Sequence, residues 1–356
     1  MAPAPLSFGQ EVAGLSPPSD ARAAARLGLT RIVPWDGFVA WVGSRVAAGA
    51  KLYVDAPRRP EMTGAPPGMP PVAGRLGLWR YALETTFPRA TIAAAGAVIN
   101  RLRWTKSEFE VDILRQNALA TVRALHAAAG SIEPGVTQRQ VEAAIVSGCL
   151  EAGTQGPSFW PWTMSGPNAH MDALVGAFYS YEHLDRQMRN GELLRVDIGC
   201  HGANYGADVG RTLPVGGSFS ATQAELWNLL VAGYLAGLEA MADGVSVTEV
   251  RAASRTRIRE LGATLGSDVA RAAVAQLDMD SAWHLHGVGI DSGEEALPVL
   301  EAGAVIAYEP MLLIGPDAFY LEDMILITEA GHEVLSAGLP YPAETLEAWA
   351  RSRQDK

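Results

Sequence analysis

VDIGCHGANYGADVGRT, residues 196–212, carries two aspartates on neighbouring strand-like runs, with three glycines between them. A hairpin over this stretch would bring Asp197 and Asp208 together. Two buried carboxylates in contact raise each other's pKa or require a cation, so their convergence predicts a metal site. The alternative is that both aspartates belong to turns or helix caps, as is common beside glycines.

A second glycine-rich stretch, HLHGVGID (284–291), supplies histidine. Glycines at 287 and 289 would let backbone or ligand approach His286 closely. His284 lies two residues earlier, on the same face if this is a strand, so spacing alone leaves either histidine as the ligand. A lone histidine is more often a core or surface residue than a ligand.

Two glutamates interrupt or border apolar runs, Glu309 in IAYEP and Glu322 in YLEDM. A carboxylate in such a place costs free energy unless it has a partner, although each alone also fits a solvent-facing position on an edge strand. Together the four acids and one imidazole supply four negative charges, which balance two divalent cations. Such ligation suits manganese, cobalt, iron or zinc, and two neighbouring ions can activate a bridging water for hydrolysis.

Helix starts and strands indicate the fold class. Four segments open with a hydroxyl residue followed three places later by Glu or Gln, which predicts four capped helices. The pairs are Ser107 with Glu110, Thr137 with Gln140, Ser220 with Gln223, and Ser246 with Glu249. Strands are predicted at ELLRVDIG (192–199), AVIAYEP (304–310) and MILIT (324–328). Paired helices separated by strands without regular βα alternation predict an α+β layer fold.

The first hundred residues mix short apolar runs with Pro/Gly-rich breaks such as GAPPGMPPVAG (64–74), which predicts a small α/β domain with a flexible loop. At 356 residues the chain also exceeds the usual single domain. We therefore expect an N-terminal domain over 1–100, with a structural or oligomerising role, and a catalytic domain over 101–356.

Composition narrows the class of protein. With 48% hydrophobic and 19% charged residues, the chain can bury a sizeable core, and its net charge of −11 argues against nucleic acid as a partner. No apolar run reaches the roughly 20 residues of a membrane helix, and the start lacks a signal-peptide pattern, so cytoplasmic is the default expectation and no membrane partner is expected. The two cysteines, Cys149 and Cys200, predict no disulfide framework and no thiolate cluster, which suits the cell interior.

The order Asp, Asp, His, Glu, Glu within the motifs DIG, ADVGRT, HGVG, YEP and LED resembles the pita-bread metallopeptidase family. That family includes methionine aminopeptidase, Xaa-Pro aminopeptidase and prolidase. The resemblance covers about residues 101–340 and begins with LRWTKSEFEVDILRQNA. It implies a pita-bread catalytic domain, preceded by a shortened version of the extra domain of the Xaa-Pro branch, and a homodimer.

The resemblance also implies roles for the five residues. Asp197 would chelate one metal ion, Asp208 and Glu322 would bridge both ions, and His286 and Glu309 would hold the other. The bridging hydroxide would be the nucleophile. Glu309 is a candidate to accept the proton that the bound water loses. The implied cofactor is a pair of divalent ions, with manganese favoured over cobalt, iron or zinc.

Three positions depart from that family. Gly293 stands seven residues after the HG histidine, where family peptidases usually carry a histidine that contacts the substrate carbonyl. A proton-handling histidine usually precedes the first metal aspartate, at a position occupied here by FYS (178–180). Tyr320 stands two residues before the bridging glutamate, where the Xaa-Pro branch commonly has arginine. The nearest candidates to replace the proton carrier are His183 and His170.

The aromatic stretch SFWPW (158–162) either walls the pocket or packs in the core, and we favour packing.

The leading hypothesis for function is an Xaa-Pro type metalloaminopeptidase acting on a peptide. The alternatives are an enzyme of the same fold acting on a small amide, cyclic amidine or other metabolite, and a metal-binding member without turnover.

Overall fold

The structure is a computed structural model. It describes residues 24–25, 28, 30, 37–54, 75–170 and 186–354. The contacts between Cα atoms divide the chain into two units, Met1–Ile99 and Asn100–Lys356. The predicted loop at 64–74 and the candidate His183 lie outside the described residues.

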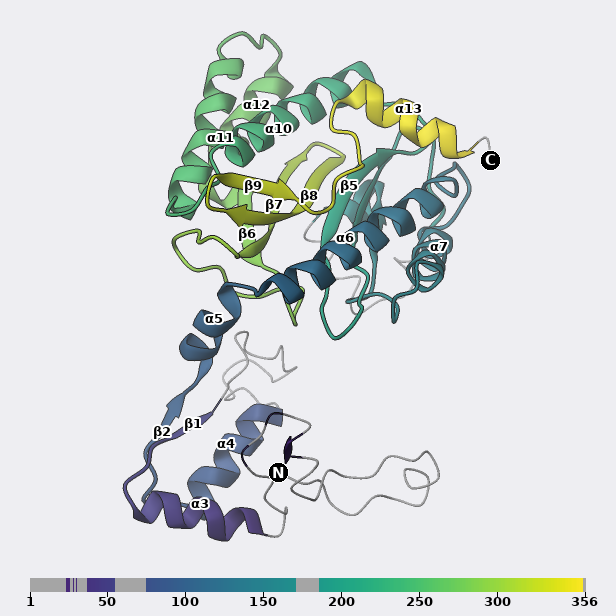
Figure 1. Cartoon of the computed structure of the whole chain (residues 1–356). Coiled ribbons are helices and arrows are strands. Elements are labelled where there is room, and N and C mark those ends of the chain that lie inside the picture. The colour runs from purple at the N-terminus through teal and green to yellow at the C-terminus, as the bar shows by residue number, and fades with distance from the viewer. Residues whose placement is uncertain are drawn as a thin grey trace, which may run out of the picture. The chain divides into compact units, whose positions relative to one another are not determined.

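The first unit contains helices and a small parallel sheet (Figure 1). Its elements are α3 (Phe38–Ala47), β1 (Leu52–Val54), α4 (Arg75–Thr86) and β2 (Ile92–Ala94). Strands β1 and β2 pair in parallel, which requires a crossover connection, and α4 lies in that connection. The described part of this unit is therefore α/β, as the apolar runs predict.

All four helices predicted from capping pairs are confirmed. They are α6 (Glu108–Ala129), α7 (Gln138–Glu151), α10 (Ala221–Glu239) and α11 (Val247–Gly262). In each, the hydroxyl residue accepts from the amide three residues on, and the Glu or Gln side chain accepts from the amide of the hydroxyl residue. Besides α3 and α4, the other long helices of the described chain are α5 (Gly96–Trp104), α12 (Asp268–Leu277) and α13 (Ala343–Gln354).

A seven-stranded antiparallel sheet forms the centre of the second unit, in the order β3-β4-β5-β8-β7-β6, with β9 paired to β8. The strands are β3 (Trp162–Ser165), β4 (Leu193–Ile198), β5 (Val209–Pro214), β6 (Trp283–Gly287), β7 (Val305–Ile314), β8 (Asp317–Thr328) and β9 (Gly331–Val334). The three predicted strands are confirmed. Strands β7 and β8 exceed the predicted apolar runs, because they continue to a tight hairpin in which Ile314 pairs with Asp317.

Helices pack against both halves of this sheet (Figure 1). Helices α6, α7 and α13 contact strands β3 and β5, whereas α10, α11 and α12 contact strands β6, β7 and β8. This layered arrangement confirms the predicted α+β class. Among the described residues, no helix is both long and apolar enough to cross a bilayer.

A fully buried ion pair joins β5 to β8. Arg211 Nη2 lies 3.0 Å from Asp323 Oδ1. The same guanidinium donates to the carbonyls of Gly210 and Glu322, each at 2.7 Å. The Asp323 carboxylate also accepts from three hydroxyls, those of Tyr234, Ser336 and Tyr341. Both ions of this buried pair make further hydrogen bonds, and together they hold the two strands in one register.

Cys149 at the end of α7 and Cys200 after β4 form a disulfide. The sequence analysis expected no disulfide framework and did not predict this single bridge. They are 51 positions apart in sequence, but α7 packs on β3, which pairs with β4. The expectation of a location inside the cell rests partly on the low cysteine count, and the disulfide weakens that support.

Reduction of this disulfide is expected to lower the free energy of unfolding by about 2–4 kcal/mol, because the bridge restricts the unfolded chain. Urea unfolding of the whole protein with and without reductant measures the difference. A Cys149→Ala, Cys200→Ala double variant is the control and should not respond to reductant. Two thiols that react with a thiol reagent in the unfolded, unreduced protein would contradict the pairing.

Candidate metal centre

The register of the sheet aligns four candidate residues across neighbouring strands. Asp197 on β4 pairs with Gly210 on β5, and Gly210 pairs with Glu322 on β8. The β7–β8 pairing brings Glu309 beside Glu322, and His284 on β6 pairs with Glu309. Directly opposed residues on antiparallel strands point to the same face. One face of the sheet therefore presents three carboxylates and an imidazole in a single row.

His286 lies at the centre of the acidic residues. Its Nε2 atom is 3.4 Å from Glu309 Oε1, 3.7 Å from Asp208 Oδ2 and 3.7 Å from Glu322 Oε1. Asp208 reaches this point from the residue directly before β5. Ligand atoms of Asp208, His286 and Glu322 all lie within 4.8 Å of one another, a spacing that a single ion can span. The structure thus brings four of the five predicted ligands together.

Asp197, the fifth predicted ligand, lies one strand farther along the row and outside both groups of mutually close ligand atoms. Gly210 separates it from Glu322, and a side chain at that position would collide with the ring of Tyr320. The glycine therefore leaves the space between the two carboxylates to Tyr320. The charge of Glu309 is among the causes that raise the pKa of Asp197.

Both histidines of the HLH motif reach the site. His286 is 14% exposed, whereas His284 is 55% exposed and lies at the margin. His284 Nδ1 forms a hydrogen bond with Glu309 Oε1, the same oxygen that faces His286. The structure thus favours His286 as the central donor and leaves His284 as its exposed neighbour.

Burial sets the ionisation of three of the carboxyls. It raises the pKa of Asp208 and of Glu322 well above their ordinary values, and neighbouring carboxylates raise both further. Burial also raises the pKa of Asp197 to about 6, against the opposing charge of Arg195. Without a cation, these groups favour the protonated form near neutral pH more than ordinary carboxyls do.

Glu309 behaves in the opposite way. Burial acts to raise its pKa, but hydrogen bonds with His284 and His286 outweigh burial and lower it. Conversely, burial acts to lower the pKa of His286, and its interactions with Glu309 raise it. Glu309 therefore favours the ionised form, whereas the neighbouring carboxyls favour the protonated form more than ordinary carboxyls do.

Two buried carboxylate oxygens indicate whether the residues fit a metal ion. Asp208 Oδ1 and Glu322 Oε1 have no hydrogen-bond partner in the described structure. A buried carboxylate oxygen without a donor is costly, and a bound cation removes that cost. The donor set of carboxylate oxygens and imidazole suits manganese, cobalt, iron or zinc. The residues present therefore fit a divalent metal centre.

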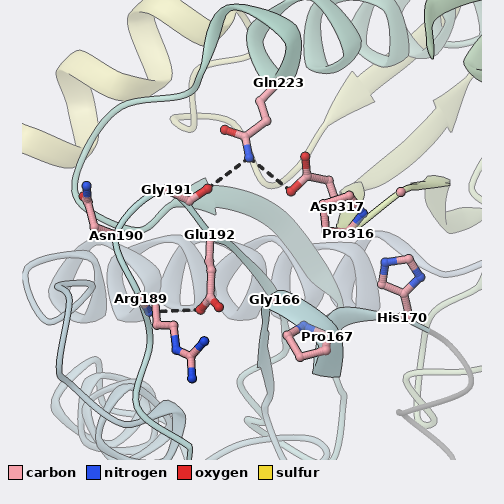
Figure 2. A pocket seen from close by; sticks show the side chains of 11 residues that line it. Gly166, Pro167, His170, Arg189, Asn190, Gly191, Glu192, Gln223, Pro316 and Asp317 are labelled. Carbon is pink, nitrogen blue, oxygen red and sulfur yellow. Dashed lines mark hydrogen bonds between the residues drawn. The ribbon is translucent and has the colours of Figure 1, made fainter. Parts of the chain in front are cut away.

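His170 lies in a different pocket (Figure 2). It follows the short helix η2 (Gly166–Ala169), and none of the predicted metal ligands lines this pocket. Gln223 spans it, donating to the Gly191 carbonyl and the Asp317 carboxylate. Asp317 lies five residues from Glu322 on β8, about 17 Å along an extended strand. The structure does not bring His170 to the metal ligands, and its catalytic role stays a prediction.

The aromatic stretch at 158–162 does not pack as we favoured. Trp160 is 61% exposed, so the packing prediction is wrong for this residue. Trp162 is half-buried and pairs with Asp197, which places it beside the row of ligands. The alternative, that this stretch walls the site, fits Trp162.

Arg195 is the residue that the sequence analysis missed. It lies two residues before Asp197 on β4, and its Nη2 atom is 3.4 Å from Asp197 Oδ2. The period-two alternation of a strand gives the signal, because it places residues 195 and 197 on one face.

The part of the chain that holds these residues is similar to known proteins. The sequence profile described as "Metallopeptidase family M24" matches residues 112–329. The Xaa-Pro aminopeptidase of Escherichia coli K12 is 28% identical over 281 residues, covering 73% of this chain and 62% of that protein. The Xaa-Pro aminopeptidase of Haemophilus influenzae is 26% identical over 271 residues, covering 70% and 61%. The matched region thus spans about three fifths of the length of these curated relatives.

Solved structures show the same fold. Aminopeptidase P from E. coli, crystallised with the inhibitor Pro-Leu, superposes with a TM-score of 0.73 at 23% identity, covering 98% of this chain and 82% of that one. Aminopeptidase PepP of Pseudomonas aeruginosa gives a TM-score of 0.71 at 21% identity, covering 94% and 78%. These likenesses confirm the predicted pita-bread fold.

Raised carboxyl pKa values predict that metal binding depends on pH. At pH 5, below the folded-state pKa of Asp197, an ion must displace protons, whereas at pH 7.5 it displaces fewer. Manganese ions should therefore raise the melting temperature of chelator-stripped protein more at pH 7.5 than at pH 5. Differential scanning calorimetry measures both shifts. An equal or larger shift at pH 5 would contradict the assignment, and the exposed-site variant Asp268→Ala should keep the wild-type dependence.

Proposed function

Because this chain belongs to metallopeptidase family M24, we propose that it is a metal-dependent aminopeptidase of the Xaa-Pro type. The observation that carries the proposal is the convergence of Asp208, Glu309 and Glu322 on His286, with buried carboxylate oxygens left for a cation. The names of the E. coli and H. influenzae relatives support the Xaa-Pro class.

We assign the ligands as the resemblance implies. Asp197 would hold one ion, Asp208 and Glu322 would contact both, and His286 with Glu309 would hold the other. Two bound ions would supply a hydroxide nucleophile at neutral pH and polarise the scissile carbonyl. Manganese as the ion, a homodimer as the assembly and the cytoplasm as the location accompany this proposal as predictions.

The residues of the chain handle the proton and the water around this chemistry. We assign Glu309 as the group that accepts the proton of the attacking water. Its two histidine contacts lower its pKa, so Glu309 would pass that proton on rather than retain it. The exposed His284, bonded to Glu309, stands between that carboxylate and solvent. His183 and His170 remain predicted proton carriers, to be tested by His183→Ala and His170→Ala.

The proposal predicts hydrolysis of Xaa-Pro dipeptides or tripeptides by chelator-stripped protein reconstituted with manganese, cobalt, iron or zinc. Asp208→Ala should lose at least a hundredfold in kcat/KM, because this variant lacks a carboxylate assigned to both ions. The assay measures release of the N-terminal residue. Asp268→Ala, far more exposed, should match wild type. Tightly bound metal without cleavage of any peptide, Met-initiated peptides included, would overturn the aminopeptidase proposal.

One observation favours a second candidate, an enzyme that acts on a small amide or cyclic metabolite. Position 293, where family peptidases usually carry a substrate-contacting histidine, is glycine, and a Cβ built there meets no atom within 4 Å. The chain therefore leaves open space where peptidases place a contact.

Gly293→His tests this candidate, because the open space accepts the larger side chain. If the protein is a peptidase with a missing contact, the variant should raise kcat/KM for Xaa-Pro peptides by about tenfold or more, the effect of one hydrogen bond to the substrate. Steady-state kinetics on the metal-loaded variant measures this. A gain for peptides supports the peptidase, whereas no gain together with turnover of small amides by wild type supports the second candidate.

A further inference from the structure

We propose that Arg195 and Tyr320 form one positioning unit that holds three of the metal-site carboxylates in place. The inference rests on the proposed metal site, and it concerns two residues with no assigned role in it. Arg195 lies two residues before Asp197 on β4, and Tyr320 lies two residues before Glu322 on β8. Both side chains therefore lie on the same face of the sheet as the ligands.

The Tyr320 hydroxyl joins the two glutamates. It lies 2.7 Å from Glu309 Oε2 and 2.7 Å from Glu322 Oε2. These are not the oxygens that face His286, which are the Oε1 atoms of both glutamates. The phenol therefore contacts two of the predicted ligands and leaves the oxygens nearest His286 free for an ion.

Arg195 holds the ring of Tyr320 and the first aspartate together. Its guanidinium carbon lies 4.1 Å from the centroid of the Tyr320 ring, and its Nη2 atom is 3.4 Å from Asp197 Oδ2. The Arg195 side chain is 4% exposed. A guanidinium stacked on an aromatic face in a desolvated place is a stronger attraction than the same pair in water. Because it is so little exposed, Arg195 acts on the carboxylates rather than on a substrate.

The surrounding residues fix the pair. Tyr320 is fully buried, and its backbone exchanges hydrogen bonds with the Thr212 side chain. Thr212 on β5 pairs with Arg195 on β4. Strand β5 therefore lies between the strands that carry Arg195 and Tyr320. Gly210 gives the Tyr320 ring its room, since any side chain there would collide with it. The guanidinium also donates to the Met311 sulfur, at 3.8 Å.

This arrangement explains the third departure from the family pattern. The Xaa-Pro branch commonly has arginine at the position of Tyr320, and this chain instead brings a guanidinium from β4, the strand that carries Asp197. The positive charge beside the carboxylates is thus kept, while Tyr320 adds a neutral donor between the glutamates.

The test is manganese affinity, measured by isothermal titration calorimetry on the full chain after chelator treatment. Tyr320→Phe and Arg195→Met are each expected to weaken binding by about 10–100-fold, the usual effect of losing a residue that orients metal ligands. The double variant should be no weaker than the weaker single variant, because the two act as one unit. Tyr308→Phe is the matched control. It removes a buried hydroxyl that contacts Ser254 and no metal ligand, and its affinity should equal that of wild type.

The measured affinities decide whether Arg195 and Tyr320 act as one positioning unit. Wild-type affinity in both single variants, tighter binding in Arg195→Met, or additive losses in the double variant would overturn the inference. If Arg195→Met fails to fold by circular dichroism, Tyr320→Phe alone carries the test, because it keeps the ring. Wild-type protein that binds no manganese would instead refute the proposed metal site itself.

Discussion

Repulsion among four carboxylates in one buried space is the constraint on which the rest of the site depends. The strand register gives three of these groups a common face, and Asp208 joins them from the end of its loop. Burial and mutual repulsion raise the pKa of three of them. Such a cluster is tolerated only if protons or cations balance the charge. The two buried oxygens without hydrogen bonds indicate that cations are the intended partners.

Rigid support surrounds this cluster. The Arg211–Asp323 pair fixes β5 against β8 directly beside Gly210, the residue that separates Asp197 from Glu322. The disulfide ties α7 to the loop that follows β4, three residues after Asp197. Ligands held on strands with such support keep their geometry without a metal, so less ordering is needed when an ion binds.

The sequence points to residues that the structure brings together, because each lies in a short motif where a carboxylate or histidine is costly without a partner. It predicts four helices because capping pairs are local. Features that depend on distant segments escape it. Cys149 and Cys200 meet only through the packing of α7 on the sheet. The exposure of Trp160 and the distance of His170 from the ligands depend on loop paths that no local pattern specifies. The sequence quoted for β4 does contain Arg195, but its partner Tyr320 lies on another strand.

The central claim is that these residues bind two metal ions. Crystals of chelator-stripped protein soaked with manganese, with diffraction collected at a wavelength where manganese scatters anomalously, test it most directly. We predict two anomalous peaks, one within ligand distance of Asp197 and one within ligand distance of His286 and Glu309, both in contact with Asp208 and Glu322. An absence of peaks at these residues, in crystals that diffract well after soaking, would contradict it.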